Sequence, residues 1–189
     1  QSYINEKKKL INKKKNFKLK IHIVKSGRKI EISDNAAGIS DADLERALTP
    51  GKPPSNDKGL SQFGMGMKTA GMWFSPKWSI LTKRIGESYA KKITFDNKKF
   101  EENTDYLTVD ESPLKKDAHF TKVELNNCHQ DIAARDVTRL KKILASMYRV
   151  FIRKGELELK YNDEILVYEQ PPITYAPAVK EHKDWVNRI

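Results

Sequence analysis

Residues 17–24 alternate between apolar and polar side chains, which limits the chain to folds that are built on a sheet. One face of this segment carries four apolar side chains, those of Phe17, Leu19, Ile21 and Ile23. A period of two places successive side chains on opposite faces, so the segment is predicted to be a half-buried strand. No apolar run approaches the about 18 residues of a membrane-spanning helix, and the sequence predicts no membrane partner.

The rest of the chain mixes strand and helix patterns. Strands are predicted at 30–34, 77–84, 89–95, 119–125 and 156–161, the last in a hairpin with 164–169. Helices are predicted at 40–48, 64–73 and 134–153, and the third is strongly amphipathic. Residues 49–62 are rich in Gly and Pro and predict a mobile loop, whereas the polar stretch 97–117 predicts a surface excursion.

Asp34 falls where the second strand should place an apolar side chain. Ile30 and Ile32 point inward in this strand, and Asp34 has the same parity. A carboxylate on an inward face is costly unless it meets a hydrogen-bond donor. The exocyclic amine of an adenine is one such donor. The other interpretation is an aspartate that closes a turn before Ala36-Ala37-Gly38.

Glycines before the second predicted helix point to phosphate binding, but two familiar motifs are excluded. Gly59 and Gly64 have the spacing of a Walker A loop, but Met65 stands where its lysine belongs. The Gly64-x-Gly66 pair lacks the third glycine of a dinucleotide fingerprint, and no strand precedes the helix. What remains is a polyphosphate seat made of the two glycines, the free amides of the first helical turn and Lys68. The alternative is a helix start that uses glycine for close packing.

Positive charge is concentrated near the N-terminus of the sequence. The formal net charge is +11, and residues 1–29 hold eleven of the 36 Lys and Arg but one of the 25 Asp and Glu. The chain from residue 30 onward is therefore close to neutral. The basic segment 1–29 could contact DNA phosphates, although runs of like charge are often solvated surface that binds nothing in particular.

Three boxes in a fixed order give the sequence a resemblance to a known family. They are Asp34-Asn-Ala-Ala-Gly38-Ile39, Gly64-Met-Gly66-Met-Lys68-Thr69 and Phe120-Thr121-Lys-Val-Glu-Leu125. They resemble the boxes of the GHKL ATPases, the Bergerat-fold superfamily of gyrase, heat-shock chaperones, histidine kinases and MutL proteins. The nearest likeness is to the MORC-type branch, which has a segment like Phe63–Thr69 and follows its last box with a long helix and a hairpin. The likeness covers about residues 17–169.

The resemblance implies a role for each box. Asp34 would accept a hydrogen bond from the adenine amine, partly through water, Gly38 would let the chain turn beneath the base, and Thr121 would add its hydroxyl at the same spot. The loop 49–62 would be a lid over the phosphates. Backbone amides and the lysine ammonium would wrap the phosphates, in a segment that consists of Phe63, Gly64, Met65, Gly66, Met67, Lys68 and Thr69. ATP and Mg²⁺ are the implied cofactors.

The sequence departs from the family pattern at three points. Ala36 stands where the family usually has its first glycine, and Phe120 stands where the last box usually has one. Phe120 would either crowd the base or face the other way on its strand. The family's metal-binding Asn and general-base Glu would lie upstream of Gln1, so no catalytic residue is expected here. Hydrolysis needs a base and a metal ion, and we expect a chain that binds ATP but hydrolyses it poorly, within a parent ATPase.

These patterns together predict an α+β fold, a two-layer α/β sandwich with a mixed, largely antiparallel sheet. Residues 1–133 would form a GHKL-type ATP-binding domain without its first helix, and 134–189 would begin a transducer-like second domain. The expected function couples nucleotide binding and lid closure to homodimerisation or to engagement of a partner such as DNA. The single cysteine, Cys128, cannot form an internal disulfide, which favours the cytoplasm.

Two other classes of protein remain open from the sequence. One is a chaperone-type GHKL module that acts on protein clients, for which the neutral body of the chain is equally suitable. The other is a non-enzymatic basic module that binds nucleic acid through residues 1–29, with purely structural glycines. Binding of an ATP analogue separates the last class from the others.

Overall fold

The computed structural model describes residues 17–49, 51, 52, 65–97 and 107–170. Its strands are β1 (Leu19–Ser26), β2 (Lys29–Asp34), β3 (Lys77–Lys83), β4 (Tyr89–Asp96), β5 (Val109–Pro113), β6 (Phe120–Asn126), β7 (Leu157–Tyr161) and β8 (Glu164–Ile165). Its helices are α2 (Asp41–Leu48), α3 (Gly66–Phe74), α5 (Ala134–Met147) and α6 (Arg149–Arg153).

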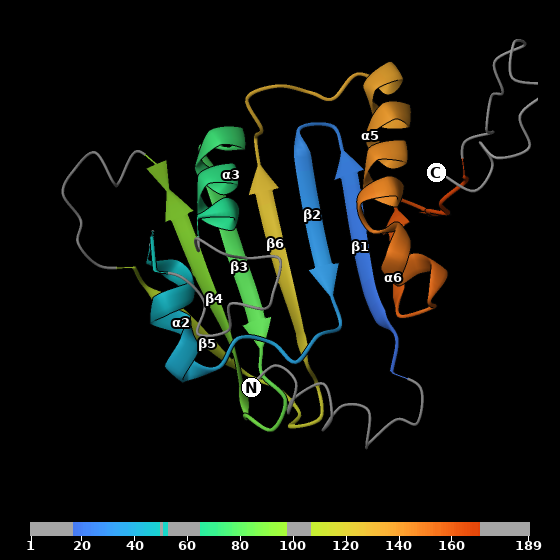
Figure 1. Cartoon of the computed structure of the whole chain (residues 1–189). Coiled ribbons are helices and arrows are strands. Elements are labelled where there is room, and N and C mark those ends of the chain that lie inside the picture. The colour runs from blue at the N-terminus through green and yellow to red at the C-terminus, as the bar shows by residue number, and fades with distance from the viewer. Residues whose placement is uncertain (1–16, 50, 53–64, 98–106, 171–189) are drawn as a thin grey trace, which may run out of the picture.

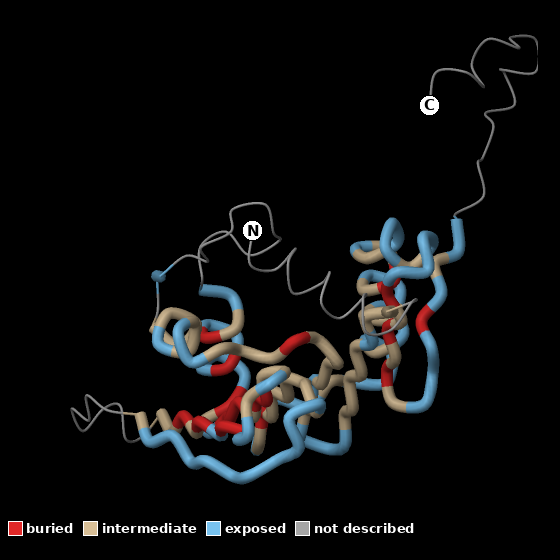
Figure 2. The backbone as a smooth tube through the Cα atoms, turned by 90° about the horizontal axis from the view of Figure 1, so that it is seen from below, coloured by how far each residue is buried: buried red, intermediate tan, exposed pale blue. Residues whose placement is uncertain are grey.

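The strands form one sheet in the order β5-β4-β3-β6-β2-β1-β7-β8 (Figure 1). Neighbouring strands are antiparallel except β1 and β7, which are parallel, so the sheet is mixed and largely antiparallel. The described helices lie on one face of the sheet, which Figure 2 shows edge-on. This arrangement is the two-layer α/β sandwich that the sequence predicts.

Three predicted segments differ from the structure, and the shortest difference is in the strand predicted at 164–169, which is β8 and ends at Ile165. The polar stretch 97–117 contains β5, which pairs with β4 from Ile93 opposite Val109 to Tyr89 opposite Pro113. All five residues of β5 are exposed, so this edge strand needs no buried face and shows no apolar alternation. The predicted helix 134–153 is divided at Tyr148, whose backbone leaves helical geometry between α5 and α6.

A first core lies between the sheet and the helices α2 and α3. Trp78 of β3 stacks on Phe95 of β4, with ring centroids 3.9 Å apart and planes 3° apart. Gly71 brings α3 down onto this stack, because a Cβ there would lie 2.5 Å from the Trp78 ring. Within α3, therefore, a glycine serves the close packing of the helix against the sheet. The first core contains Trp78, Ile80, Ile93, Phe95, Leu125 and Cys128.

A second core lies between the strands β1 and β7 and the helices α5 and α6. Its buried members are Ala145, Leu157, Leu159, Tyr161 and Leu166. Between the two cores, Ile32 of β2 points to the helix-bearing face and is nevertheless 37 % exposed. The described helices therefore leave the middle of the sheet, over β2, open to solvent.

The segment from residue 134 onward joins the same sheet. The helices α5 and α6 connect β6 to β7, and β7 extends β1 in parallel, with Ile21 opposite Leu159. The division into domains at residue 134 stays a prediction. None of the helices in the described part of the chain has the length and the apolar character that a membrane crossing needs.

Candidate nucleotide-binding site

Three polar side chains form a row across the helix-bearing face of the sheet. Thr121 of β6 lies opposite Asp34 of β2 on one side and opposite Thr82 of β3 on the other. Directly opposite residues of antiparallel strands point to the same face, so the three side chains are neighbours. The next row toward the first core is apolar, with Ile80 opposite Val123. The polar row therefore interrupts an apolar surface at the open part of the sheet.

Asp34 is held in a half-buried setting. Burial raises the pKa of its carboxyl group. Hydrogen bonds from the backbone N–H groups of Ala36 (2.8 Å) and Thr121, and the positive charge of nearby His119, act in the opposite direction on this pKa. The bond from Ala36 means that Asp34 does close a turn. A carboxylate has about four acceptor sites, so these two bonds leave room for a further donor.

Gly38 occupies a position that tolerates no side chain. Its φ is +77°, and a Cβ there would lie 2.1 Å from the carbonyl oxygen of Lys83. An L-residue would therefore suffer both an unfavourable backbone conformation and a direct clash. This glycine lets the turn after β2 lie directly against the end of β3.

The turn at residues 35–39 is fixed to its neighbours by its backbone. Three of its carbonyl oxygens accept hydrogen bonds: that of Ala36 from His119 Nδ1 (3.0 Å), that of Ala37 from Ile85 N–H (3.0 Å) and that of Gly38 from Arg84 (3.3 Å). The N–H of Ile39 donates to the Thr82 hydroxyl (2.9 Å). A carbonyl oxygen only accepts, so Nδ1 of His119 must carry its proton. The turn is thus held in place before any ligand arrives.

The other end of the candidate site is the start of α3. Met65, at the N-cap position, makes no capping bond with its side chain, and Thr69 N–H makes the first intrahelical bond, to the Met65 carbonyl (2.9 Å). The amides of Gly66, Met67 and Lys68 precede that bond and have no intrahelical acceptor. A Cβ at Gly66 would meet none of the described atoms within 4 Å, so packing among these residues does not require this glycine. These features suit an approaching anion.

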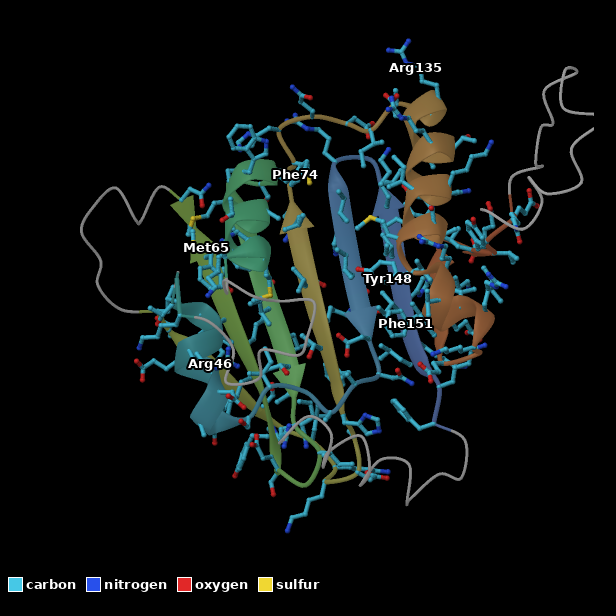
Figure 3. The ribbon with its side chains drawn as sticks, in the orientation of Figure 1. Arg46, Met65, Phe74, Arg135, Tyr148 and Phe151 are labelled. Carbon is cyan, nitrogen blue, oxygen red and sulfur yellow. The ribbon has the colours of Figure 1, made fainter. Side chains whose placement is uncertain are left out.

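Lys68 is buried at the foot of α3. Its side chain is 3 % exposed and donates to the carbonyl oxygen of Thr49, where the loop 49–62 begins. Burial lowers the pKa of Lys68, and the positive charge of Arg46 lowers it further. An ammonium group has three donors, so the bond to Thr49 leaves capacity for a phosphate oxygen. Arg46 of α2 and Met65 at the start of α3 lie on the same side of the molecule (Figure 3).

The remaining predicted site residues are placed as follows. Met67 packs against the first core, whereas Met65 and Thr69 are exposed. Phe63 and Gly64 lie outside the described residues. The structure therefore brings Asp34, Gly38 and Thr121 together and places Gly66 and Lys68 at the start of α3.

The structure shows how Ala36 and Phe120, which depart from the family pattern, are accommodated. Thr121 shares the helix-bearing face with Asp34, so Phe120, one residue earlier in the strand, points to the opposite face. Phe120 therefore does not crowd the candidate site for the base. Ala36 has no positive φ, and its backbone makes the bonds to Asp34 and His119 that the turn requires. Alanine fits there without strain.

Thr82 is a residue of the candidate site that the sequence patterns did not predict. This side chain is 1 % exposed and bonds both the turn, at Ile39, and the strand β6, at the Phe120 carbonyl (3.3 Å). The available signal was its parity: Thr82 shares the inward face of β3 with Trp78 and Ile80, as Asp34 shares that of β2. A threonine is unremarkable in a strand, and its neighbours depend on register that the sequence does not display.

Comparisons with known proteins agree with this geometry. Residues 13–129 match the model of the family described as histidine kinase-, DNA gyrase B- and HSP90-like ATPases. The match spans more than half of the 189 residues, and the chain belongs to this family. A search of curated protein sequences found no match.

A solved structure shares the fold. It is the crystal structure of the ATPase and transducer domains of DNA topoisomerase II from Balamuthia mandrillaris, with a TM-score of 0.57 and 14% sequence identity. The match covers 88% of this chain and 48% of that chain, so this chain spans about half the length of the solved one. At this identity the likeness supports the fold.

Proposed function

We propose that the chain binds ATP, with the adenine against the row of Asp34, Thr121 and Thr82 and the phosphates at the start of α3. The observation that carries the proposal is the half-buried carboxylate of Asp34, in register with two hydroxyls on the open part of the sheet. A purine with an exocyclic amine offers the donor that such a carboxylate needs. Membership of an ATPase family supports the same ligand.

Different residues of the chain would bind the base and the phosphates. Asp34 and Thr121 would read the edge of the base, and the preformed turn at Gly38 would support its face. The uncapped amides of α3 and Lys68 would bind the phosphates through N–H donors and positive charge. Because Lys68 also holds Thr49, phosphate binding there would act directly on the start of the loop 49–62. We propose that this is how nucleotide binding closes the lid.

Magnesium would enter with the triphosphate. Mg²⁺ in nucleotide sites is held largely by phosphate oxygens and water, where it offsets the phosphate charge. The described residues contain no cluster of three or more His, Cys, Asp or Glu that could hold a metal, so we assign it no protein ligand. The three carboxylates of α2 are engaged in ion pairs, Asp41 with Lys91, Asp43 with Arg46 and Glu45 with Lys52. We propose that the chain binds ATP without hydrolysing it efficiently.

Calorimetric titration with a non-hydrolysable ATP analogue and magnesium tests the proposal. Asp34→Ala should weaken binding roughly 10- to 150-fold, because it removes a hydrogen bond to a charged group. Asp110→Ala, on the exposed strand β5, is the matched control and should leave the affinity unchanged. GTP should bind more weakly than ATP, since a guanine in the orientation proposed for adenine would place its O6, which cannot donate, against Asp34. Equal affinity of the wild-type chain and Asp34→Ala would refute the assignment.

The finer proposal is a MORC-like module that dimerises on ATP binding and engages DNA. In the described part of the basic segment, Lys18 and Lys20 pair with Glu158, Lys25 with Asp131 and Lys29 with Glu124. We propose that DNA contact depends mainly on residues 1–16, which hold six lysines. Their deletion should reduce the salt slope of duplex binding by about 0.9 per lost phosphate contact, and an unchanged slope would rule this segment out. Sedimentation with and without the ATP analogue tests dimerisation.

A further inference from the structure

The hydroxyl group of Thr82 connects the two halves of the base site. It accepts a hydrogen bond from Ile39 N–H (2.9 Å), which belongs to the turn after β2. It lies 3.3 Å from the carbonyl oxygen of Phe120 and 3.4 Å from the hydroxyl oxygen of Thr121, both on β6. One buried oxygen atom thus contacts the turn that would support the base and the side chain that would read it.

The proton of Thr82 determines what Thr121 can offer. A hydroxyl group has one proton and two acceptor sites, and Ile39 N–H already uses one of those sites. If Thr82 donates to Thr121, the proton of Thr121 is free for a ligand. If Thr82 donates instead to the Phe120 carbonyl, its second acceptor site can take the Thr121 proton, and Thr121 then presents only lone pairs. The pair can therefore present a donor or an acceptor.

The apolar surroundings of Thr82 indicate that its hydroxyl group serves to make these hydrogen bonds. Trp78 and Ile80 occupy the same face of β3, and both are completely buried. A valine of the same shape would suit such a face better, because a buried hydroxyl costs free energy unless it is bonded. Its loss would also leave the Ile39 N–H without this acceptor.

We propose that Thr82 is a positioning residue for nucleotide binding, which through one hydroxyl group fixes the turn at Gly38 and orients the hydroxyl of Thr121. This inference rests on the proposed function, since it assumes that the base lies against Asp34 and Thr121. Thr82 itself would not contact the ligand and would act on it through the turn and through Thr121.

Titration of the full chain with the ATP analogue tests the inference. Thr82→Val keeps the shape of the side chain and removes the hydroxyl, and it should weaken binding about 5- to 10-fold. Two further variants, Thr82→Ser and Thr82→Ala, differ from each other only in the hydroxyl group. The serine variant should bind within about twofold of wild type, and the alanine variant should bind as weakly as the valine variant. Thr94→Val, on the opposite face of β4, is the control and should bind like wild type.

A double-mutant cycle separates positioning from general support of the fold. If Thr82 acts through Thr121, then Thr82→Val should weaken binding less in a Thr121→Val background than in wild type. The inference is overturned if Thr82→Ser binds as weakly as Thr82→Ala, if Thr82→Val binds like wild type, or if the two single effects multiply. If Thr82→Val does not fold, the serine and alanine pair decides the question. Loss of the Asp34→Ala effect would instead count against the proposed function itself.

Discussion

Asp34 on β2 lies directly opposite Thr121 on β6, and both side chains point to the face of the sheet that carries the helices. The two residues are far apart in the sequence and belong to different boxes, so the register of the strands alone makes them neighbours. A slip of one residue would send one of them to the other face. The candidate site is therefore a property of the sheet as much as of its side chains.

The first prediction concerns the cost of keeping Asp34 ionised. Burial raises the pKa of Asp34 in the folded chain, so its negative charge reduces the free energy of unfolding at neutral pH. Asp34→Asn keeps an acceptor for Ala36 N–H and removes the charge. We expect this variant to be at least as stable as wild type at pH 7 while it loses affinity for ATP.

The stability gain of Asp34→Asn should shrink as the pH falls, because the wild-type carboxyl becomes protonated and its desolvation cost disappears below the raised pKa. Urea unfolding between pH 7 and about pH 3.5 measures this. Asp110→Asn, on the exposed strand β5, controls for general charge effects. A stability loss in Asp34→Asn that is largest at pH 7 would contradict the account.

The second prediction compares two glycines with similar φ angles. Gly38 has φ +77° and a blocked Cβ position, whereas Gly86 has φ +88° and open space around it. Gly86→Ala should cost about 1–2 kcal/mol of unfolding free energy, from the backbone conformation alone. Gly38→Ala should cost about 3 kcal/mol or more, because the clash with the Lys83 carbonyl is added. Equal losses in thermal or urea unfolding would show that the turn can move away from β3.

The third prediction separates the two ends of the nucleotide. Lys68→Met should weaken binding of the ATP analogue roughly 10- to 100-fold, since it removes a charged donor to phosphate. Adenosine has no phosphate, and its affinity should change by less than about threefold. Lys92→Met, an exposed lysine of β4, is the control. Parallel titrations with both ligands measure the difference, and equal losses for both would place Lys68 outside a phosphate site.

The fourth prediction concerns Lys83, a fully buried lysine behind the Gly38 turn. Its ammonium donates to the carbonyl oxygens of Arg84 (2.7 Å), Glu87 (2.6 Å) and Ala118 (3.4 Å). Lys83→Met would leave these carbonyls without that donor and should cost about 2–3 kcal/mol of unfolding free energy. Lys92→Met should stay within about 0.5 kcal/mol of wild type in urea unfolding. If the two variants are equally stable, these three hydrogen bonds do not stabilise the hairpin of β3 and β4.

Much of the fold could be predicted because its strands are half-buried and its helices amphipathic. The alternation at 17–24 and the parity of Asp34 are visible to any reader of the sequence, and the structure confirms the α+β sandwich. The strand β5 was missed because every residue of it is exposed, and the break at Tyr148 was missed because the helical period continues across it.

The site was harder to predict because its contacts are distant in sequence. Glycine at position 38 is readable, but its cause, the carbonyl oxygen of Lys83, becomes known only when β3 is placed. Thr82 has the same inward parity as Asp34, yet a threonine raises no question until β6 puts Thr121 beside it. Lys68 is a clear phosphate candidate, and only the structure places it against Thr49.

A structure of the chain with a non-hydrolysable ATP analogue and magnesium tests the central claim most directly. The account predicts the exocyclic amine of adenine within hydrogen-bond distance of the Asp34 carboxylate, directly or through one water, with the phosphates at the start of α3. A nucleotide bound elsewhere, or an adenine that leaves the Asp34 carboxylate without contact, would contradict it.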